Sequence, residues 1–279
     1  MMSLLKTILD FYIRSSLHVG ICFVAMAMVY HFTYQFYVPF GYYIFLFCSA
    51  VAGYNLIKYG FIWLKNRLLS NVLYKLLSIA AAAIALIILL KLNISSYAWF
   101  LLMIVILINM LYVLPIWKGH GLRYSPFFKL FSVSIVWAIL IIAIPQFLYY
   151  NTGVDTPVII EFNRGVLTND AVEWHTLKIF ILVIALCIPF EIRDLKYDEE
   201  QLQTLPQVLG IKASKYIGLI LCIFYLLLLC YSLPNVLEVI MVIITAIAIW
   251  FSDRFKSDYY SSFFVEAIPL LWLGMYNIL

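Results

Sequence analysis

The chain has 279 residues and a net charge of +4, with 66% hydrophobic and only 11% charged residues. Soluble domains carry about 45–50% apolar and about 25% charged residues, so the composition excludes a soluble globular protein and predicts a multi-pass protein of the lipid bilayer. Spans of about 20 residues each use nearly all of the length, which excludes a sizeable soluble domain. The distribution of the positive charge follows membrane topology, so we expect no nucleic-acid partner.

Nine apolar runs follow one another along the chain and predict an all-α integral membrane protein with nine transmembrane helices. An amphipathic segment at residues 1–14 precedes them as an expected interfacial helix. The predicted spans are about residues 15–36, 39–63, 72–90, 96–116, 127–149, 174–190, 214–232, 234–252 and 260–278. They leave cytoplasmic connections at about residues 64–71, 117–126, 191–213 and 253–259, within a single membrane domain over residues 1–279. The five cysteines form no CxxC pair, which supports neither a disulfide framework nor a zinc site.

The basic residues fall mainly in alternate connections, as the positive-inside rule requires. Fifteen of the 18 Lys and Arg residues lie on the side of the N-terminus, and three lie on the other side. The fifteen are Lys6, Arg14, Lys58, Lys65, Arg67, Lys75, Lys118, Arg123, Lys129, Arg193, Lys196, Lys212, Lys215, Arg254 and Lys256. This bias predicts a cytoplasmic N-terminus and an external C-terminus in the cell (inner) membrane.

An acidic stretch, EIRDLKYDEEQLQTLPQVLG at residues 191–210, lies between the sixth and seventh predicted spans. If the preceding helix continues into it, Glu191, Asp194 and Asp198 share one helical face. Three carboxylates on one face repel one another unless a cation lies between them. Their oxygens suit Mg²⁺, which commonly bridges one or two carboxylates to the phosphates of a substrate. The alternative interpretation is a solvated acidic loop.

Two segments carry a resemblance to a known membrane family. The run E-x-x-D-x-x-x-D from Glu191 to Asp198, followed by TLP at 204–206 and LG at 209–210, is similar to the second aspartate motif of the UbiA superfamily of intramembrane prenyltransferases. Many members have Asp where this chain has Glu191. Residues 111–129, LYVLPIWKGHGLRYSPFFK, resemble the segment in which a Tyr, a Pro and basic residues precede the fifth span. The predicted topology resembles the family over nearly the whole chain.

The resemblance implies a helical bundle around a central cavity that opens to lipid. Members of the family use Mg²⁺ to bind an isoprenyl diphosphate, ionise it and transfer the prenyl cation to a lipophilic acceptor. For this chain the resemblance implies Asp194 and Asp198 as catalytic metal ligands, with Glu191 as a further ligand. It implies a diphosphate site formed by Asn55, Lys58, Tyr59, Lys118 and Arg123.

The first aspartate motif of the family, NxxxDxxxD, is degenerate in this chain. Asn55 stands at the Asn position, but Tyr59 and Trp63 occupy the two Asp positions on the same helical face. Tyr and Trp are poor ligands for a hard divalent cation, and residues 12–150 contain no carboxylate. The first metal half-site is therefore missing.

Two hypotheses about function follow. In the first, the protein is a UbiA-like prenyltransferase with one Mg²⁺ at Asp194 and Asp198, and Lys58, Lys118 or Arg123 supplies further positive charge to the diphosphate. In the second, the fold is retained without the reaction, and the protein binds a lipid or serves as an accessory subunit of a membrane-protein complex. The intact second motif favours the first hypothesis.

One carboxylate, Glu266, is predicted inside the last span. Carboxylates within the membrane are costly and are commonly functional, so Glu266 is a candidate site residue. The alternative is a hydrogen-bonded Glu beside a kink at Pro269. A transporter would place charged groups at mid-membrane between two related halves, and the sequence shows no matching half-repeat.

Overall fold

The computed structural model describes residues 2–34, 38–65, 72–114, 127–148, 169–198, 202–230, 235–255 and 257–278. These residues form helices and turns, and none of them lies in a strand. The helices are α1 (Met2–Arg14), α2 (Leu17–Thr33), α3 (Phe40–Lys65), α4 (Val72–Lys91), α5 (Ser96–Val113), α6 (Phe128–Ala138), α7 (Asn169–Asp194), α8 (Leu205–Leu229), α9 (Val236–Phe251) and α10 (Ile268–Ile278). Two π-helical segments, η2 (Ile139–Ala143) and η5 (Tyr260–Val265), and one 3-10 turn, η3 (Pro145–Phe147), extend or precede them.

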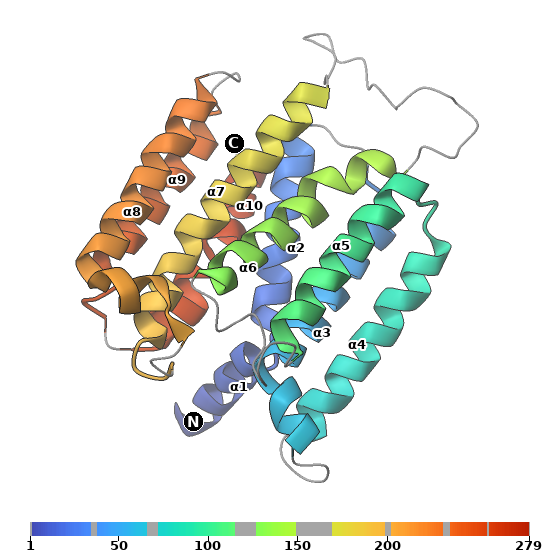
Figure 1. Ribbon diagram of the computed structural model, residues 1–279, viewed down its shortest axis with the longest axis horizontal. Coiled ribbons are helices and arrows are strands. Elements are labelled where there is room, and N and C mark those ends of the chain that lie inside the picture. The colour runs from blue at the N-terminus through green and yellow to red at the C-terminus, as the bar shows by residue number, and fades with distance from the viewer. Residues whose placement is uncertain are drawn as a thin grey trace.

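Helix α7 lies in the middle of the bundle, between α6 on one side and α8 and α9 on the other (Figure 1). Over an 18-residue window 72% of the α7 residues are buried, against 17% of those in α4, which lies at the edge beside α3. The two chain ends lie toward opposite ends of the bundle (Figure 1). The acidic motif is thus carried by the most enclosed helix.

The nine predicted spans are not confirmed, although each of them contains a helix. Among the described residues, six helices are long and apolar enough to cross a membrane, and a seventh span is counted if the bent pair α1 and α2 is one span. Helix α9 has 16 residues, which at about 1.5 Å per residue falls short of a hydrocarbon core of about 30 Å. The last predicted span is divided between η5 and α10. Average hydropathy does not detect such breaks.

The acidic connection is shorter than the predicted residues 191–213. Helix α7 continues through Asp194, and α8 begins at Leu205. The amides of Tyr197 and Asp198 both donate to the Asp194 carbonyl at 2.8 Å, which closes α7 in a turn. The TLP sequence starts α8, where a proline costs no helical hydrogen bond. Gly210 then breaks the helical geometry with φ of 84°, a conformation that glycine adopts at little cost.

The bend between α1 and α2 is fixed by buried polar contacts from α3. The two helices meet at 59°, and Ser16 at the bend has a left-handed φ of 62°, which costs a residue other than glycine about 1–3 kcal/mol. The Ser16 hydroxyl donates to Asn55 Oδ1 at 2.8 Å, and Asn55 Nδ2 donates to the Ser15 carbonyl at 3.0 Å. Both serines and Asn55 are fully buried, so these bonds offset the strain.

The π-helical segment after α6 results from Pro145. Proline has no amide hydrogen, so carbonyls one turn earlier lose their helical partner inside an apolar environment. Two side chains supply the missing donors. Tyr42 donates to the Leu140 carbonyl at 2.6 Å, and His31 Nε2 donates to the Ile141 carbonyl at 2.7 Å. These bonds connect η2 to α2 and α3.

Candidate functional site

A lysine ammonium lies between the three carboxylates of the acidic motif. Lys129 Nζ is 3.0 Å from Glu191 Oε1, 3.1 Å from Asp194 Oδ2 and 3.5 Å from Asp198 Oδ2. The Lys129 side chain is 28% exposed, whereas that of Glu191 is 4% exposed. We call these four residues the Lys129 cluster. The expected cation at the centre of the motif is thus a residue of the chain itself.

Helix geometry explains why the three carboxylates meet. Glu191 and Asp194 are three residues apart in α7 and therefore point to the same side. Asp198 follows the helix end, and the turn at residues 195–198 returns its carboxylate to that side. Lys129 is the second residue of α6, which packs against α7. Convergence was predicted from the spacing, and the structure achieves it partly by a turn.

Arg193 adds a second positive charge to the edge of the Lys129 cluster. Its guanidinium binds Asp194 Oδ1 at 2.6 Å through one terminal nitrogen and at 2.7 Å through Nε. The guanidinium also lies over the Phe190 ring, 5.2 Å from the ring centre. Asp194 is therefore held by two cations, and each of its oxygens has a partner.

A cavity of about 270 Å³ opens beside the Lys129 cluster. Its polar lining combines three cationic and three acidic side chains, which are Lys58, Lys129, Arg193, Glu191, Asp194 and Glu266. The remaining lining is mainly apolar and comes from α1, α3, α5, α6, α7 and the segment around η5. We call this the head cavity, because its charges gather at the end of α7 that carries the acidic motif.

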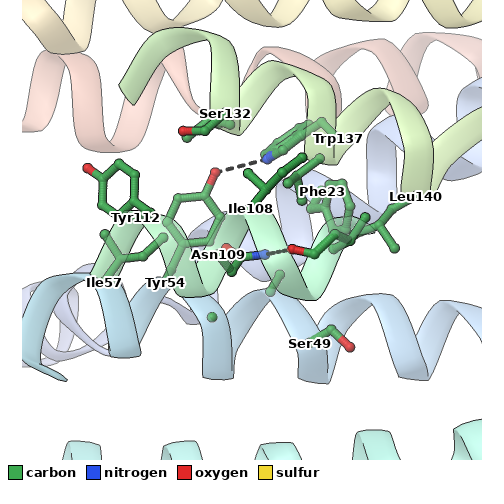
Figure 2. A pocket seen from close by; sticks show the side chains of 15 residues that line it. Phe23, Ser49, Tyr54, Ile57, Ile108, Asn109, Tyr112, Ser132, Trp137 and Leu140 are labelled. Atoms are coloured by element: carbon green, nitrogen blue, oxygen red, sulfur yellow. Dashed lines mark hydrogen bonds between the residues drawn. The ribbon is translucent and has the colours of Figure 1, made fainter. Parts of the chain in front are cut away.

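A second cavity of about 100 Å³ adjoins the head cavity and lies between α3, α5 and α6. Both cavities are lined by Tyr54, Ile57, Tyr112, Val133 and Trp137. Figure 2 shows Tyr54 and Trp137 meeting across the second cavity, where the indole nitrogen donates to the Tyr54 hydroxyl at 2.9 Å. Its lining is mostly apolar and aromatic, with Phe23 and Ile108 on its walls (Figure 2). We call it the tail cavity.

The structure brings together four of the predicted site residues around the head cavity and places two elsewhere. Glu191, Asp194, Lys58 and Glu266 line the head cavity, and Asp198 joins them through Lys129. Asn55 and Tyr59 instead hold the bend between α1 and α2. Asn55 binds Ser15 and Ser16, as described above, and the Tyr59 hydroxyl donates to the Arg14 carbonyl at 3.0 Å. Lys118 and Arg123 lie outside the described residues, as does the side chain of Trp63.

Lys58 lies at the head cavity without a carboxylate partner among the described residues. Its ammonium donates to the Ser16 hydroxyl at 3.0 Å and approaches the Ile13 carbonyl at 3.5 Å. These direct partners are neutral oxygens, and no carboxylate of the described residues lies within ion-pair distance of the Lys58 ammonium. Glu266 lies in the turn that joins η5 to α10. The helix interruption that was predicted near Pro269 therefore lies three residues before this proline.

Lys129 was missed as a site residue. From the sequence, Lys129 is only one of the basic residues on the side of the N-terminus. One signal was available, because a lysine just inside an apolar run needs a partner or a path to water. Its partners lie about 65 residues further along the chain, and sequence spacing cannot identify contacts across that distance.

A second buried ion pair joins α7 to α9 away from both cavities. Lys178 Nζ is 3.3 Å from Glu238 Oε2, and both side chains are 1% exposed. The Tyr225 hydroxyl donates to Glu238 Oε2 at 3.0 Å, and Tyr34 donates to the other oxygen. The Tyr30 hydroxyl contacts that of Tyr225 at 2.7 Å. We call these five residues the Lys178 cluster. Neither Lys178 nor Glu238 lines either cavity.

Among solved structures, the apo structure of a UbiA homolog from Aeropyrum pernix K1 is similar to this chain, with a TM-score of 0.55 and 15% sequence identity. The match covers 97% of this chain and 98% of that chain. At this identity the likeness establishes the fold. The chain is therefore a multi-pass membrane protein with a UbiA-like fold. No family model and no curated protein matches the sequence.

The acidic motif, as its side chains lie, does not fit the divalent ion that this fold implies. A Mg²⁺ bound to Glu191, Asp194 and Asp198 would need carboxylate oxygens at about 2.0–2.1 Å, and the oxygens that face the centre of the motif already bind Lys129. No group of three or more His, Cys, Asp or Glu in the described part of the chain forms a metal site. Magnesium at this motif stays a prediction, and it has no place there unless Lys129 moves.

Proposed function

We propose that this protein binds an isoprenyl diphosphate in the adjacent head and tail cavities and transfers the prenyl group to a lipophilic acceptor. The observation that carries the proposal is that a charged cavity adjoins an apolar, aromatic one and shares five lining residues with it. An amphiphile with a charged head and a hydrocarbon chain matches this division. Ligand sites are commonly concave, mostly apolar and furnished with a few polar groups.

Lys58 is proposed to bind the diphosphate. Of the three cations that line the head cavity, Lys129 and Arg193 are paired with carboxylates, whereas Lys58 binds neutral oxygens only among the described residues. A phosphate oxygen can accept a charge-assisted hydrogen bond from its ammonium. Lys118 and Arg123 are proposed to add positive charge from the segment before α6. The positive-inside bias favours a cytoplasmic position for this end of the bundle.

The tail cavity is proposed to hold the hydrocarbon chain. Tyr54 and Trp137 line both cavities and are held to each other by their hydrogen bond, so their rings are proposed to flank the bond that would break. Aromatic faces attract cations, including the allylic cation that forms when a diphosphate departs. This arrangement supports transfer as well as binding.

Transfer requires three changes of bonding. The carbon–oxygen bond to the diphosphate breaks with its electron pair on the leaving oxygen, a nucleophilic atom of the acceptor bonds to the allylic carbon, and the acceptor then loses a proton. Glu266 lines the head cavity and is proposed to receive that proton. A neighbouring base of this kind is effective when it lies within hydrogen-bond reach of the acceptor.

A second candidate function is lipid binding without transfer, as an accessory subunit. The positions of Asn55 and Tyr59 favour it, because residues that stand in the first aspartate motif hold a helix bend instead of facing the cavities. A UbiA-like bundle could keep its cavities for a lipid after losing catalysis. Such a protein would bind the amphiphile and release no diphosphate.

The test is binding and turnover of radiolabelled geranylgeranyl diphosphate by the purified protein in detergent. The wild type is expected to bind it, and Lys58→Met is expected to weaken binding at least tenfold. Lys75→Met is the matched control, because Lys75 is an exposed lysine of α4 that lines neither cavity. Val133→Trp fills the junction of the cavities and is expected to abolish binding, whereas Ile220→Trp adds the same bulk to an exposed position of α8.

The outcomes separate the two candidates. Release of diphosphate together with a new organic-soluble product, after addition of a membrane lipid extract, supports transfer. Binding without product, with stoichiometric co-purification of another membrane protein, favours the accessory function. Absence of binding by the folded wild type under every condition would sink both proposals for this ligand.

A further inference from the structure

We propose that Lys129 is a built-in counterion that replaces a divalent metal in the acidic motif, so that the head cavity works without Mg²⁺. The inference deepens the proposed function, on which its consequence for ligand binding rests. Its structural content, the exclusion of a metal ion by Lys129, is independent of any ligand. The observation behind it is the convergence of three carboxylates on one ammonium group.

The geometry of Lys129 is that of a central cation. Its ammonium offers three hydrogens, and three carboxylate groups from two successive turns of chain lie within 3.5 Å of it. A lysine on a surface usually pairs with one carboxylate in a loose geometry. Here Glu191 is 4% exposed, and an unpaired carboxylate at that depth would be strongly unfavourable. Lys129 therefore has the role that a bound cation would otherwise fill.

The rest of the chain agrees with this replacement. The first aspartate motif of the UbiA family would fall within residues 12–150, which contain no carboxylate. Asn55 and Tyr59, at the positions of the first motif, hold backbone groups of the α1–α2 bend. One half of the metal site is absent from the sequence, and in the other half Lys129 and Arg193 already pair with the carboxylates.

The replacement predicts that deleting the Lys129 ammonium turns the motif into a divalent-cation site. In Lys129→Ala, the three carboxylates would face one another without a partner, apart from the bond between Asp194 and Arg193. Carboxylate oxygens brought together in this way are the ligands that Mg²⁺ and Mn²⁺ prefer. The wild type and the variant should therefore differ in metal affinity and not merely in stability.

The experiment measures Mn²⁺ binding to the purified full-length protein by electron paramagnetic resonance, with Mn²⁺ as the probe for Mg²⁺. We expect Lys129→Ala to bind Mn²⁺ at least tenfold more tightly than the wild type. Asp194→Asn and Asp198→Asn in the Lys129→Ala background should abolish the gain. Lys129→Arg keeps the charge and should not show the gain. Lys196→Ala is the matched control, because Lys196 belongs to the same acidic stretch but pairs with Asp258.

Mn²⁺ binding measured on the wild type can contradict the inference by itself. The test therefore remains valid even if the Lys129→Ala variant does not fold. Tight Mn²⁺ binding by the wild type that is lost in Asp194→Asn/Asp198→Asn would show that Lys129 gives way to a metal. A folded Lys129→Ala protein without any gain in Mn²⁺ affinity would also contradict the proposal.

Ligand binding provides a second readout that separates this inference from the proposed function. Binding of geranylgeranyl diphosphate to the wild type is expected to be equal in EDTA and in Mg²⁺. Loss of binding in EDTA would overturn the inference and leave the proposed function standing. Absence of binding in both conditions would overturn the proposed function, while the Mn²⁺ result would still decide the role of Lys129.

Discussion

The two lysine clusters accommodate charged side chains inside the helical bundle in opposite ways. In the Lys178 cluster one lysine faces one carboxylate, and phenol hydroxyls occupy both oxygens of Glu238. In the Lys129 cluster one lysine faces three carboxylates beside a cavity, and its side chain is 28% exposed. The first arrangement is balanced and enclosed. The second holds excess negative charge where a ligand or water can reach it.

The difference indicates which cluster is structural. The Lys178 cluster joins α7, α9, α8 and α2, and both carboxylate oxygens of its buried pair are already bonded, so it gains little from a further partner. A cluster with surplus charge at a cavity can change partners when a ligand arrives. Strength of contact alone would not separate them, because both contain a lysine within 3.3 Å of a carboxylate oxygen. The Lys129 cluster has more negative than positive groups and is accessible from a cavity, unlike the Lys178 cluster. These two properties distinguish the head cavity as the candidate site.

The largest effect is expected for Glu238→Gln. The substitution removes the carboxylate that balances the Lys178 charge in an enclosed place, and breaking a buried ion pair in this way costs about 3–5 kcal/mol. Thermal unfolding in detergent, followed by size-exclusion chromatography, measures the loss. The double variant Lys178→Met/Glu238→Gln removes the orphaned charge and should recover most of the stability. A Glu238→Gln protein as stable as the wild type would contradict the assignment of a structural role.

A smaller effect is expected for the same substitution in the other cluster. Glu191→Gln leaves Lys129 with Asp194 and Asp198, so no charge is orphaned, and we expect a change in unfolding free energy below about 1 kcal/mol. The same thermal assay measures it beside Glu238→Gln. If Glu191→Gln lowers the stability as much as Glu238→Gln does, the Lys129 cluster has no surplus of negative charge. The proposed difference between the two clusters would then be wrong.

The smallest effect is expected at the exposed ion pair of Lys196 with Asp258. The hydrogen bond from Lys196 holds the pKa of Asp258 below its ordinary value. A depressed carboxylate pKa stabilises the fold above the pKa of the unfolded chain, and the contribution is lost as the pH falls through the lower, folded pKa. The unfolding temperatures of the wild type and Asp258→Asn should therefore differ slightly at pH 7 and converge in acid. A difference that grows as the pH falls would contradict the sign.

Sequence alone determined the class of protein and part of the site. Hydrophobic content fixed a multi-pass membrane protein, because only long apolar helices satisfy their backbone in lipid. The spacing of Glu191, Asp194 and Asp198 predicted a common side, since helical periodicity is a local property. The UbiA-like fold follows from the same motif and topology, and the structural comparison confirms it.

Only the tertiary structure decided what those carboxylates bind. Lys129, Lys178 and Glu238 find their partners across α6, α7 and α9, and contacts between helices distant in sequence depend on packing that no local pattern encodes. The structure has fewer candidate spans than the nine predicted, because the break at η5 and the short length of α9 depend on local backbone geometry. Asn55 lies at the bend between α1 and α2, where it accepts a hydrogen bond from the buried Ser16 hydroxyl. The candidate site residues could be identified from the sequence, but their interaction partners are determined by the tertiary structure.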